Sequence, residues 1–289
     1  MQQENFISYL SSEKRFSRHT IISYSNDINQ FALFLSEQFQ IKNEVAEINF
    51  HMVRSWIAFL LEQGIAPRSV NRKISTLKTY FKFLIREGVI RDSPMLKVVS
   101  PKSKKRLPLF VEENQIELLL NEVEFDGGFF GQRDKLIIEL FYATGIRLSE
   151  LINIKVLDIN FDKNLIKVLG KRNKERLIPI SVRVAKELQY FIEKYKLVNY
   201  LITNLEGEKV YTKLVYRIVN RYIGKISSVN KKSPHVLRHT FATHMLNNGA
   251  DINAIKELLG HANLSATQVY THNTIEKLKT VYKQAHPRA

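Results

Sequence analysis

One short region of this chain has the pattern of β-strands, and long stretches with helical periodicity lie on both sides of it. Residues 157–161, 165–169 and 175–180 alternate or run apolar and are separated by turn residues, as in the strands of a small antiparallel sheet. Outside them, apolar residues recur every three or four positions, which is the period of an amphipathic helix. The sequence therefore predicts a mainly α fold with a small antiparallel β-sheet in the C-terminal domain.

Residues 3–87 have the pattern of several helices with short breaks. The most informative of these helices begins at Pro67, because proline suits the first helical turn. Its apolar stripe consists of Val70, Ile74, Leu77, Phe81 and Leu84. Its opposite face is basic and polar: Arg68, Arg72, Ser75, Lys78, Thr79 and Lys82. Two interpretations of this face stay open, namely contact with nucleic-acid phosphates and an ordinary solvated surface.

A basic segment interrupted by prolines separates two parts of the chain. It covers residues 101–108. Its basic residues are Lys102, Lys104, Lys105 and Arg106. Such a segment forms either a strap over DNA or a plain flexible linker, and both interpretations stay open. We expect a helical domain over residues 1–100, the basic linker over 101–108, and a second domain over 109–289.

The charge balance narrows the kinds of partner. Lys and Arg number 44 against 28 Asp and Glu, so the formal net charge is +16. This excess favours a polyanion, with nucleic acid first and an anionic membrane second. A C-terminal helix carries a row of cations at a spacing of four, which fits the same partner. The row consists of Lys213, Arg217, Arg221 and Lys225.

Cysteine usage and apolar content indicate the compartment. The chain has no cysteine, which excludes disulfides and thiolate zinc sites and is compatible with a reducing cytosol. Its first residues lack the basic and apolar regions of a signal peptide. No stretch approaches the roughly 18 to 20 apolar residues that span a bilayer. We therefore expect a cytoplasmic protein without a membrane partner.

A helix start at Ser233-Pro234 carries two candidate site residues. Serine suits the cap position and proline the first turn. His235 and Arg238 share a face near the positive end of this helix, which suits a phosphate. His235 and His239 also have the i,i+4 spacing of a zinc site, but the usual Glu is absent. We expect no metal, and a satisfied core histidine remains the alternative for His235.

Four further candidates occupy places where a side chain can be aimed at a ligand. Arg147 lies at the start of a short helix, where the dipole disfavours a cation unless Glu150 or a bound anion holds it. Lys171 lies at a hairpin tip, His261 follows a helix-ending glycine, and Tyr270 comes nine residues later. Each has an ordinary structural alternative, such as a solvated turn for Lys171 and a core position for Tyr270. Only the whole set points to one site around a phosphate.

Four motifs carry a resemblance to a known family. In order they are TGIRLSEL, GKRNKERLIPI, HVLRHTFATHML and LLGHANLSATQVYTH. Together they resemble the tyrosine recombinase (phage integrase) family over essentially the whole chain, and within it the bacterial Xer recombinases. The resemblance implies a helical SAM-like domain that binds core DNA, followed by a catalytic domain. It also implies a catalytic set without a cofactor: Arg147, Lys171, His235, Arg238, His261 and the nucleophile Tyr270, with Glu150 supporting Arg147.

By the same resemblance, the expected function is site-specific DNA recombination through a 3′-phosphotyrosyl intermediate. The expected role is chromosome dimer resolution at a dif-like site. A mobile-element integrase, a type IB topoisomerase-like enzyme and a non-catalytic DNA-binding protein stay open as alternatives.

The expected partners follow from this function. They are double-stranded DNA, further subunits of a homo- or hetero-tetramer on two DNA sites, a paralogous recombinase and a cell-division DNA translocase. The tail helix over about 274–286 folds back on its own domain or docks into a neighbouring subunit, and the resemblance favours docking. The expected DNA contacts are Arg68, Arg72, Lys78, Lys82, Lys104, Lys105, Arg106, Lys213, Arg217 and Arg221.

Overall fold

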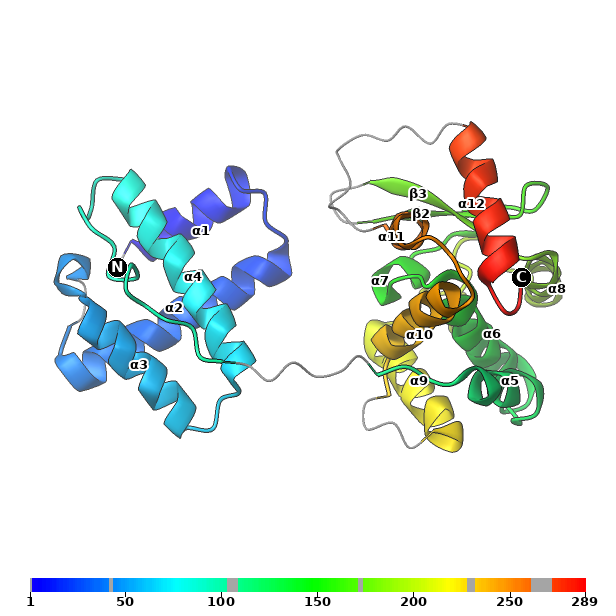
Figure 1. Ribbon diagram of the computed structural model, residues 1–289, viewed down its shortest axis with the longest axis horizontal. Helices are drawn as coiled ribbons and strands as arrows, with labels where there is room; N and C mark the ends of the chain where they lie inside the picture. Colours follow the sequence, from blue (N-terminus) through cyan, green and yellow to red (C-terminus); the bar gives the residue numbers. More distant parts are fainter. Residues whose placement is uncertain (1, 42–43, 103–108, 171–173, 228–231, 261–271) are drawn as a thin grey trace. The chain divides into compact units, whose positions relative to one another are not determined.

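The chain folds into two compact units, Met1–Arg106 and Leu107–Ala289, both drawn in Figure 1. The computed structural model describes residues 2–41, 44–102, 109–170, 174–227, 232–260 and 272–289. Each unit has a hydrophobic core of its own.

The first unit is helical. Its elements are α1 (Gln3–Ser12), α2 (Arg18–Phe39), the 3-10 turn η1 (Val45–Glu47), α3 (Phe50–Glu62) and α4 (Pro67–Arg86). Local caps begin two of them: Ser17 accepts a hydrogen bond from the N–H of Thr20, and Asn49 accepts from the N–H groups of His51 and Met52. Large aromatic side chains fill the core, among them Phe31 and Trp56. The helical prediction for this part of the chain is confirmed.

Helix α4 has the amphipathic character that its sequence predicts. The whole predicted stripe is buried: Val70, Ile74, Leu77, Phe81 and Leu84. This stripe packs on α2 and α3. The opposite, basic face is consequently left toward the surface of this unit.

In the second unit, shorter helices and a small sheet surround one long helix. Its helices are α5 (Glu113–Asn121), α6 (Gly128–Thr144), α7 (Leu148–Leu151), α8 (Val182–Tyr195), α9 (Thr212–Ile226), α10 (Pro234–Asn247), α11 (Ile252–Leu259) and α12 (His272–Ala285). Nearly every residue in the second half of α6 is buried, because α8 and α10 pack against it. Gly145 caps the C-terminus of α6. Because α6 is held in place by this packing, the point at which the chain continues into α7 is fixed as well.

The sheet consists of three antiparallel strands in the order β1 (Ile159–Asn160), β2 (Leu165–Leu169) and β3 (Glu175–Pro179). In the β2–β3 register, Ile166 lies opposite Ile178 and Val168 opposite Arg176. The first strand is shorter than the predicted 157–161. A 3-10 turn, η2 (Val156–Asp158), replaces its start, since the carboxylate of Asp158 accepts a hydrogen bond from the N–H of Lys155. The predicted mainly α fold with a small antiparallel sheet is otherwise confirmed.

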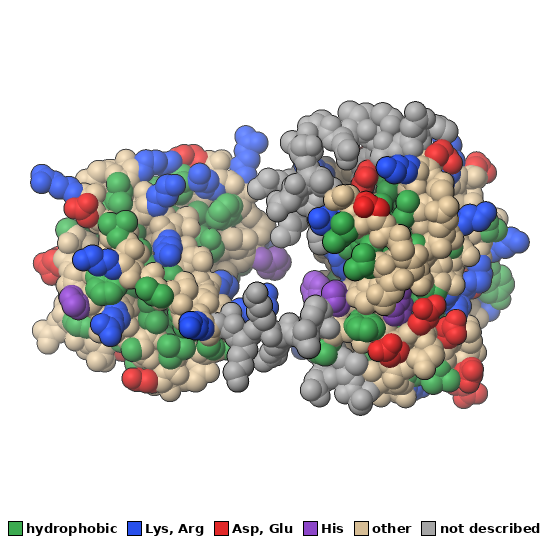
Figure 2. All heavy atoms as spheres, viewed as in Figure 1, with side chains coloured by type: hydrophobic (Ala, Val, Ile, Leu, Met, Phe, Trp, Pro, Cys, Tyr) green, Lys and Arg blue, Asp and Glu red, His purple; other side chains and the backbone are tan. Residues whose placement is uncertain are grey.

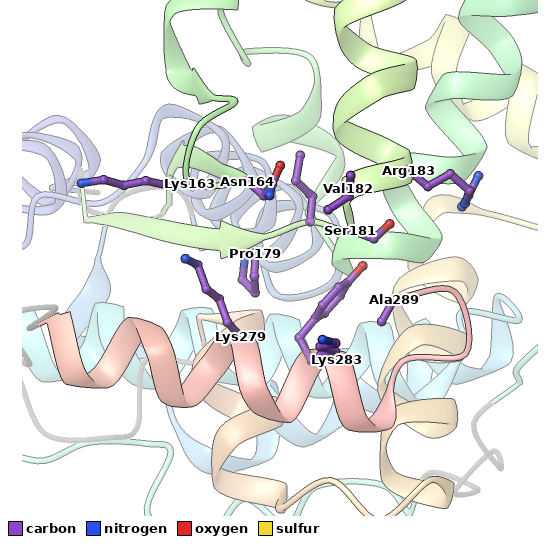
Figure 3. A pocket seen from close by; sticks show the side chains of 11 residues that line it. Lys163, Asn164, Pro179, Ser181, Val182, Arg183, Lys279, Lys283 and Ala289 are labelled. Atoms are coloured by element: carbon purple, nitrogen blue, oxygen red, sulfur yellow. The ribbon is translucent and has the colours of Figure 1, made fainter.

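Helix α12 packs on its own domain in this single chain. Its residues Leu278, Tyr282 and Ala285 join a cluster with Phe241 and Met245 of α10, and Figure 1 shows α12 beside α10 and the sheet. A cavity of about 330 Å³ remains between α12, the end of β3 and the start of α8. Figure 3 shows this cavity, with Lys279 reaching from the helix toward the strand. The contact of α12 with its domain is therefore incomplete on one side.

None of the helices in the described ranges combines the length and the apolar content needed to cross a bilayer. These ranges also contain no group of three His, Cys, Asp or Glu side chains that could hold a metal ion.

Candidate active site

Two of the predicted site residues, Arg147 and Arg238, meet at the carboxyl end of α11. The helix ends at Gly260, whose φ of 65° is left-handed. The last carbonyls of a helix lack partners within it, and cations are favoured at this end. Here Arg238 Nη2 donates to the carbonyl of Leu259 at 2.7 Å, and Arg147 Nη2 donates to the carbonyl of Gly260 at 2.8 Å. Two arginines that lie 91 positions apart in the sequence thus meet at one helix end.

Glu150 holds Arg147 at the start of α7. Arg147 Nη1 donates to Glu150 Oε1 at 2.8 Å, and the N–H of Arg147 donates to Oε2 at 2.9 Å. Burial alone would raise the pKa of Glu150, but Arg176 and Arg147 bring it below its ordinary value. The carboxylate is therefore ionised at neutral pH, and it offsets the unfavourable position of Arg147 at a helix start.

Arg238 projects from the first turns of α10 into the same space. Its Nη1 donates to the carbonyl of Gly145 at 2.5 Å. Burial lowers the pKa of Arg238, and repulsion from Arg147 and Arg176 lowers it further. A guanidinium remains a cation at neutral pH. The lowered pKa therefore indicates that the surroundings of Arg238 hold too little negative charge to balance its positive charge. His235 lies one turn earlier on α10 and is exposed.

Gly145 makes this geometry possible between α6 and α7. Its φ is 57°, and a Cβ there would lie 2.5 Å from Cδ1 of Phe241 and 2.7 Å from Cδ2 of Leu259. No side chain fits without displacing one of these neighbours. Glycine therefore allows α6 to end against α10 and α11 while its carbonyl faces Arg238.

Lys171, His261 and Tyr270 lie outside the described residues, and their roles stay predictions. The described residues that precede Lys171 and His261 in the sequence, Gly170 and Gly260, both lie beside Arg147 or Glu150. Gly170 closes the base of the β2–β3 hairpin by donating its N–H to the carbonyl of Lys174 at 2.8 Å. A Cβ at Gly170 would lie 3.5 Å from Glu150 Oε1. The residue before Lys171 therefore adjoins the carboxylate that holds Arg147, and the residue before His261 accepts a hydrogen bond from Arg147.

Sequence reasoning missed Arg176 of β3. It is only 4% exposed. Its Nη1 and Nη2 donate to Glu150 Oε1 and Oε2 at 2.6 and 2.8 Å. A signal was present, because Arg176 shares its strand face with Ile178 and Ile180, and both are buried. We call Arg147, Arg176 and Arg238, together with Glu150, the arginine cluster.

Comparison with known proteins decides the family. The Phage integrase family model matches residues 110–277, which hold the arginine cluster. The model for the Phage integrase N-terminal SAM-like domain matches residues 4–88. The chain belongs to the tyrosine recombinases of the phage integrase family. It is accordingly a site-specific recombinase that acts on DNA.

Individual relatives of this recombinase agree. It is 43% identical over 292 residues to Tyrosine recombinase XerC of Staphylococcus epidermidis, covering 99% of this chain and 97% of the relative. XerH bound to a palindromic difH substrate superposes with a TM-score of 0.73 at 18% identity, covering 99% of this chain and 81% of that one. The Tn1549 transposon integrase in complex with transposon right end DNA gives 0.73 at 19% identity, covering 96% and 99%. At these identities the two structures show a shared fold.

The predicted DNA-contact residues of the recombinase differ in whether their side chains are paired with other residues of the protein. On α4, Arg68, Lys78 and Lys82 are exposed. Figure 2 shows Lys and Arg side chains spread over the face of the first unit that carries α4. Arg72 is also exposed, but it forms an ion pair with the buried Asp27 of α2. On the basic face of α4, Arg72 is therefore paired with an acidic residue of another helix, which the sequence of α4 alone does not show.

The basic row on α9 is partly engaged as well. Arg221 donates to both carboxylate oxygens of Asp126, at 2.6 and 2.8 Å, and Arg217 donates to the hydroxyl of Tyr211. Lys213 is exposed. The linker residues Lys104, Lys105 and Arg106 lie outside the described ranges. DNA contact by any of these groups stays a prediction.

Proposed function

We propose that this recombinase cleaves and rejoins DNA through a 3′-phosphotyrosyl intermediate formed on Tyr270. The observation that carries the proposal is the arginine cluster: two guanidinium groups pair with one carboxylate, and a third, that of Arg238, lies near enough to be repelled by both. Two positive charges remain in a partly buried space, which suits a phosphodiester whose negative charge grows during attack. The same proposal assigns the surrounding roles to Lys171, His235 and His261.

Donor geometry supports phosphate binding by Arg147 and Arg238. Each guanidinium has five N–H donors, and each gives two of them to residues that the structure describes. The remaining donors can form the forked contact that arginine makes with phosphate oxygens. Because the existing bonds fix both groups, little reorganisation is needed when DNA binds.

The proposed reaction requires no metal ion, because side chains carry out each proton transfer. A phenol has a pKa near 10, so Tyr270 needs assistance to attack at neutral pH. Its oxygen forms a bond to phosphorus while the bond to the 5′ oxygen breaks, and Lys171 supplies the proton to that oxygen. His235 accepts or orients the tyrosine proton, and His261 donates to a phosphate oxygen. A 5′ hydroxyl from another strand reverses these steps and joins new partners.

We further propose the biological setting from the relatives named XerC. It is resolution of chromosome dimers at a dif-like site in the cytoplasm, by a tetramer with a paralogous recombinase and under a cell-division DNA translocase. Exchange of α12 between subunits belongs to this proposal.

Covalent capture tests the proposed reaction. The recombinase, alone and with its paralogue, is incubated in EDTA with chromosomal fragments, denatured in detergent, and the protein-linked DNA is sequenced. We expect one dominant site, protein on the 3′ phosphate, a free 5′ hydroxyl, and exchanged flanks when two sites are present. Absence of protein-linked DNA, or linkage to 5′ phosphates, contradicts the proposal. Relaxation without exchanged flanks favours the topoisomerase alternative.

Charge removal on α4 tests the proposed DNA-binding face. Replacing Arg68, Lys78 and Lys82 with Gln should weaken binding and lower the slope of log affinity against log salt by about 2.7, if each residue contacts one phosphate. A matched variant changes Lys135, Lys186 and Lys194, three exposed lysines of α6 and α8, and removes the same charge. A slope measured by fluorescence anisotropy that falls equally in both variants would show that only net charge matters.

A further inference from the structure

Glu150 has a complete set of hydrogen bonds. An ionised carboxylate has about four acceptor positions, two on each oxygen. Oε1 accepts from Arg147 Nη1 and Arg176 Nη1, at 2.8 and 2.6 Å. Oε2 accepts from the N–H of Arg147 and from Arg176 Nη2, at 2.9 and 2.8 Å. Arg176 therefore provides half of the bonds that hold this carboxylate in place.

Arg176 also supports the carboxyl end of α11. Its Nε donates to the carbonyl of Leu258 at 3.1 Å. It lies so close to Gly260 that a Cβ there would be 3.0 Å from Arg176 Cδ and 3.2 Å from its Nε. One side chain thus contacts α7 through Glu150 and the end of α11 through Leu258 and Gly260.

We propose that Arg176 is a positioning residue for recombination, which fixes Glu150 and Gly260 so that Arg147 is aimed at the phosphate. The proposal rests on the role given to Arg147 in the proposed function. Arg176 is only 5% exposed in its side chain, and its donors face Glu150 and Leu258. It acts on the reaction through these groups.

The electrostatic reason is the sharing of one negative charge. With Arg176 present, Glu150 balances two guanidinium groups, so Arg147 keeps positive charge available for DNA. Without Arg176, the same buried carboxylate would keep its ion pair with Arg147 and lose the one with Arg176. The stronger mutual attraction would draw Arg147 toward Glu150 and away from the phosphate. A displacement of about 1 Å in a positioned group can lower a rate about a hundredfold.

Arg176→Lys is the first test, because lysine keeps the charge and loses the planar two-pronged contact, so it tests the placement of Glu150 separately from the sharing of its charge. We expect covalent adduct formation on saturating nicked DNA to fall about a hundredfold, with DNA affinity within about threefold. Arg133→Lys is the matched control. Arg133 is equally buried in the same domain and is paired with Asp134, outside the arginine cluster. It should show a comparable fall in Tm with a cleavage rate within about threefold of the unchanged protein.

A double-mutant cycle separates positioning from stability. Arg176→Gln and Glu150→Gln each disturb the charge balance, whereas the double variant restores the net charge of the cluster and keeps amide hydrogen bonding. We expect the double variant to cleave at least about tenfold faster than the product of the two single effects predicts. All rates are measured well below the lowest Tm of the set.

The outcomes distinguish this proposal from the proposed function. Failure of the unchanged recombinase to form an adduct would overturn the function itself. An adduct formed by Arg176→Lys at the unchanged rate would overturn only the positioning role. So would multiplicative effects in the cycle, or equal losses of cleavage in Arg176→Lys and Arg133→Lys.

Discussion

Tyr270→Phe is expected to abolish the covalent protein–DNA adduct, with a fall of at least about ten-thousandfold in its rate of formation. The reason is chemical, because phenylalanine lacks the oxygen that forms the bond to phosphorus. DNA affinity should stay within about threefold, since binding is proposed to depend on cations elsewhere. The measurement is gel separation of denatured protein–DNA adducts on a nicked site, beside a binding titration with the same DNA.

A matched tyrosine variant controls for the loss of a hydroxyl. Tyr216 lies on α9 and is 40% exposed, and Tyr216→Phe should leave adduct formation unchanged within about threefold. Tyr282 is the next tyrosine after Tyr270, but it is 3% exposed and its burial raises its pKa. A buried phenol of this kind is a poor nucleophile. Persistence of the adduct in Tyr270→Phe would show that the nucleophile is assigned wrongly.

Local pattern predicted the elements that depend on neighbouring residues. The apolar stripe of α4 and its start at Pro67 follow from spacing and residue type within one helix, and both are confirmed. The 3-10 turn η2 did not follow from alternation, because a side-chain bond from Asp158 to the N–H of Lys155 replaces the start of the first strand. Elements were thus predictable where local periodicity was not opposed by such a bond.

Long-range ion pairs were beyond the reach of the sequence. Arg72 meets Asp27 across 45 positions, and Arg221 meets Asp126 across 95. Arg72 and Arg221 each looked free within their own helices, since the partner of each belongs to a distant segment. For the candidate site, the pairing of Arg147 with Glu150 was predictable because they are three residues apart. Arg176 was not, because alternation assigned it to a buried face without indicating which carboxylate it would meet.

The second large effect is expected from Arg238. Arg238→Ala should lower the rate of adduct formation about a thousandfold, or by about 4 kcal/mol of transition-state stabilisation. The side chain is held by the carbonyls of Gly145 and Leu259 and is repelled by Arg147 and Arg176. The attraction of Glu150 opposes this repulsion only in part, so a bound phosphate would add a favourable charge interaction that strengthens as charge develops on the phosphate oxygens. DNA affinity should change much less than the rate.

Substrate charge then tests whether this loss is electrostatic. A scissile methylphosphonate lacks one charged oxygen, so the reaction on it needs less cationic stabilisation. If Arg238 neutralises that charge, the rate ratio between the unchanged recombinase and Arg238→Ala should shrink at least about tenfold on the methylphosphonate. Arg238 also holds the ends of α6 and α11 together, and a purely structural loss would give the same ratio on both substrates. An unchanged ratio would therefore remove Arg238 from the proposed chemistry and leave it as a support of the fold.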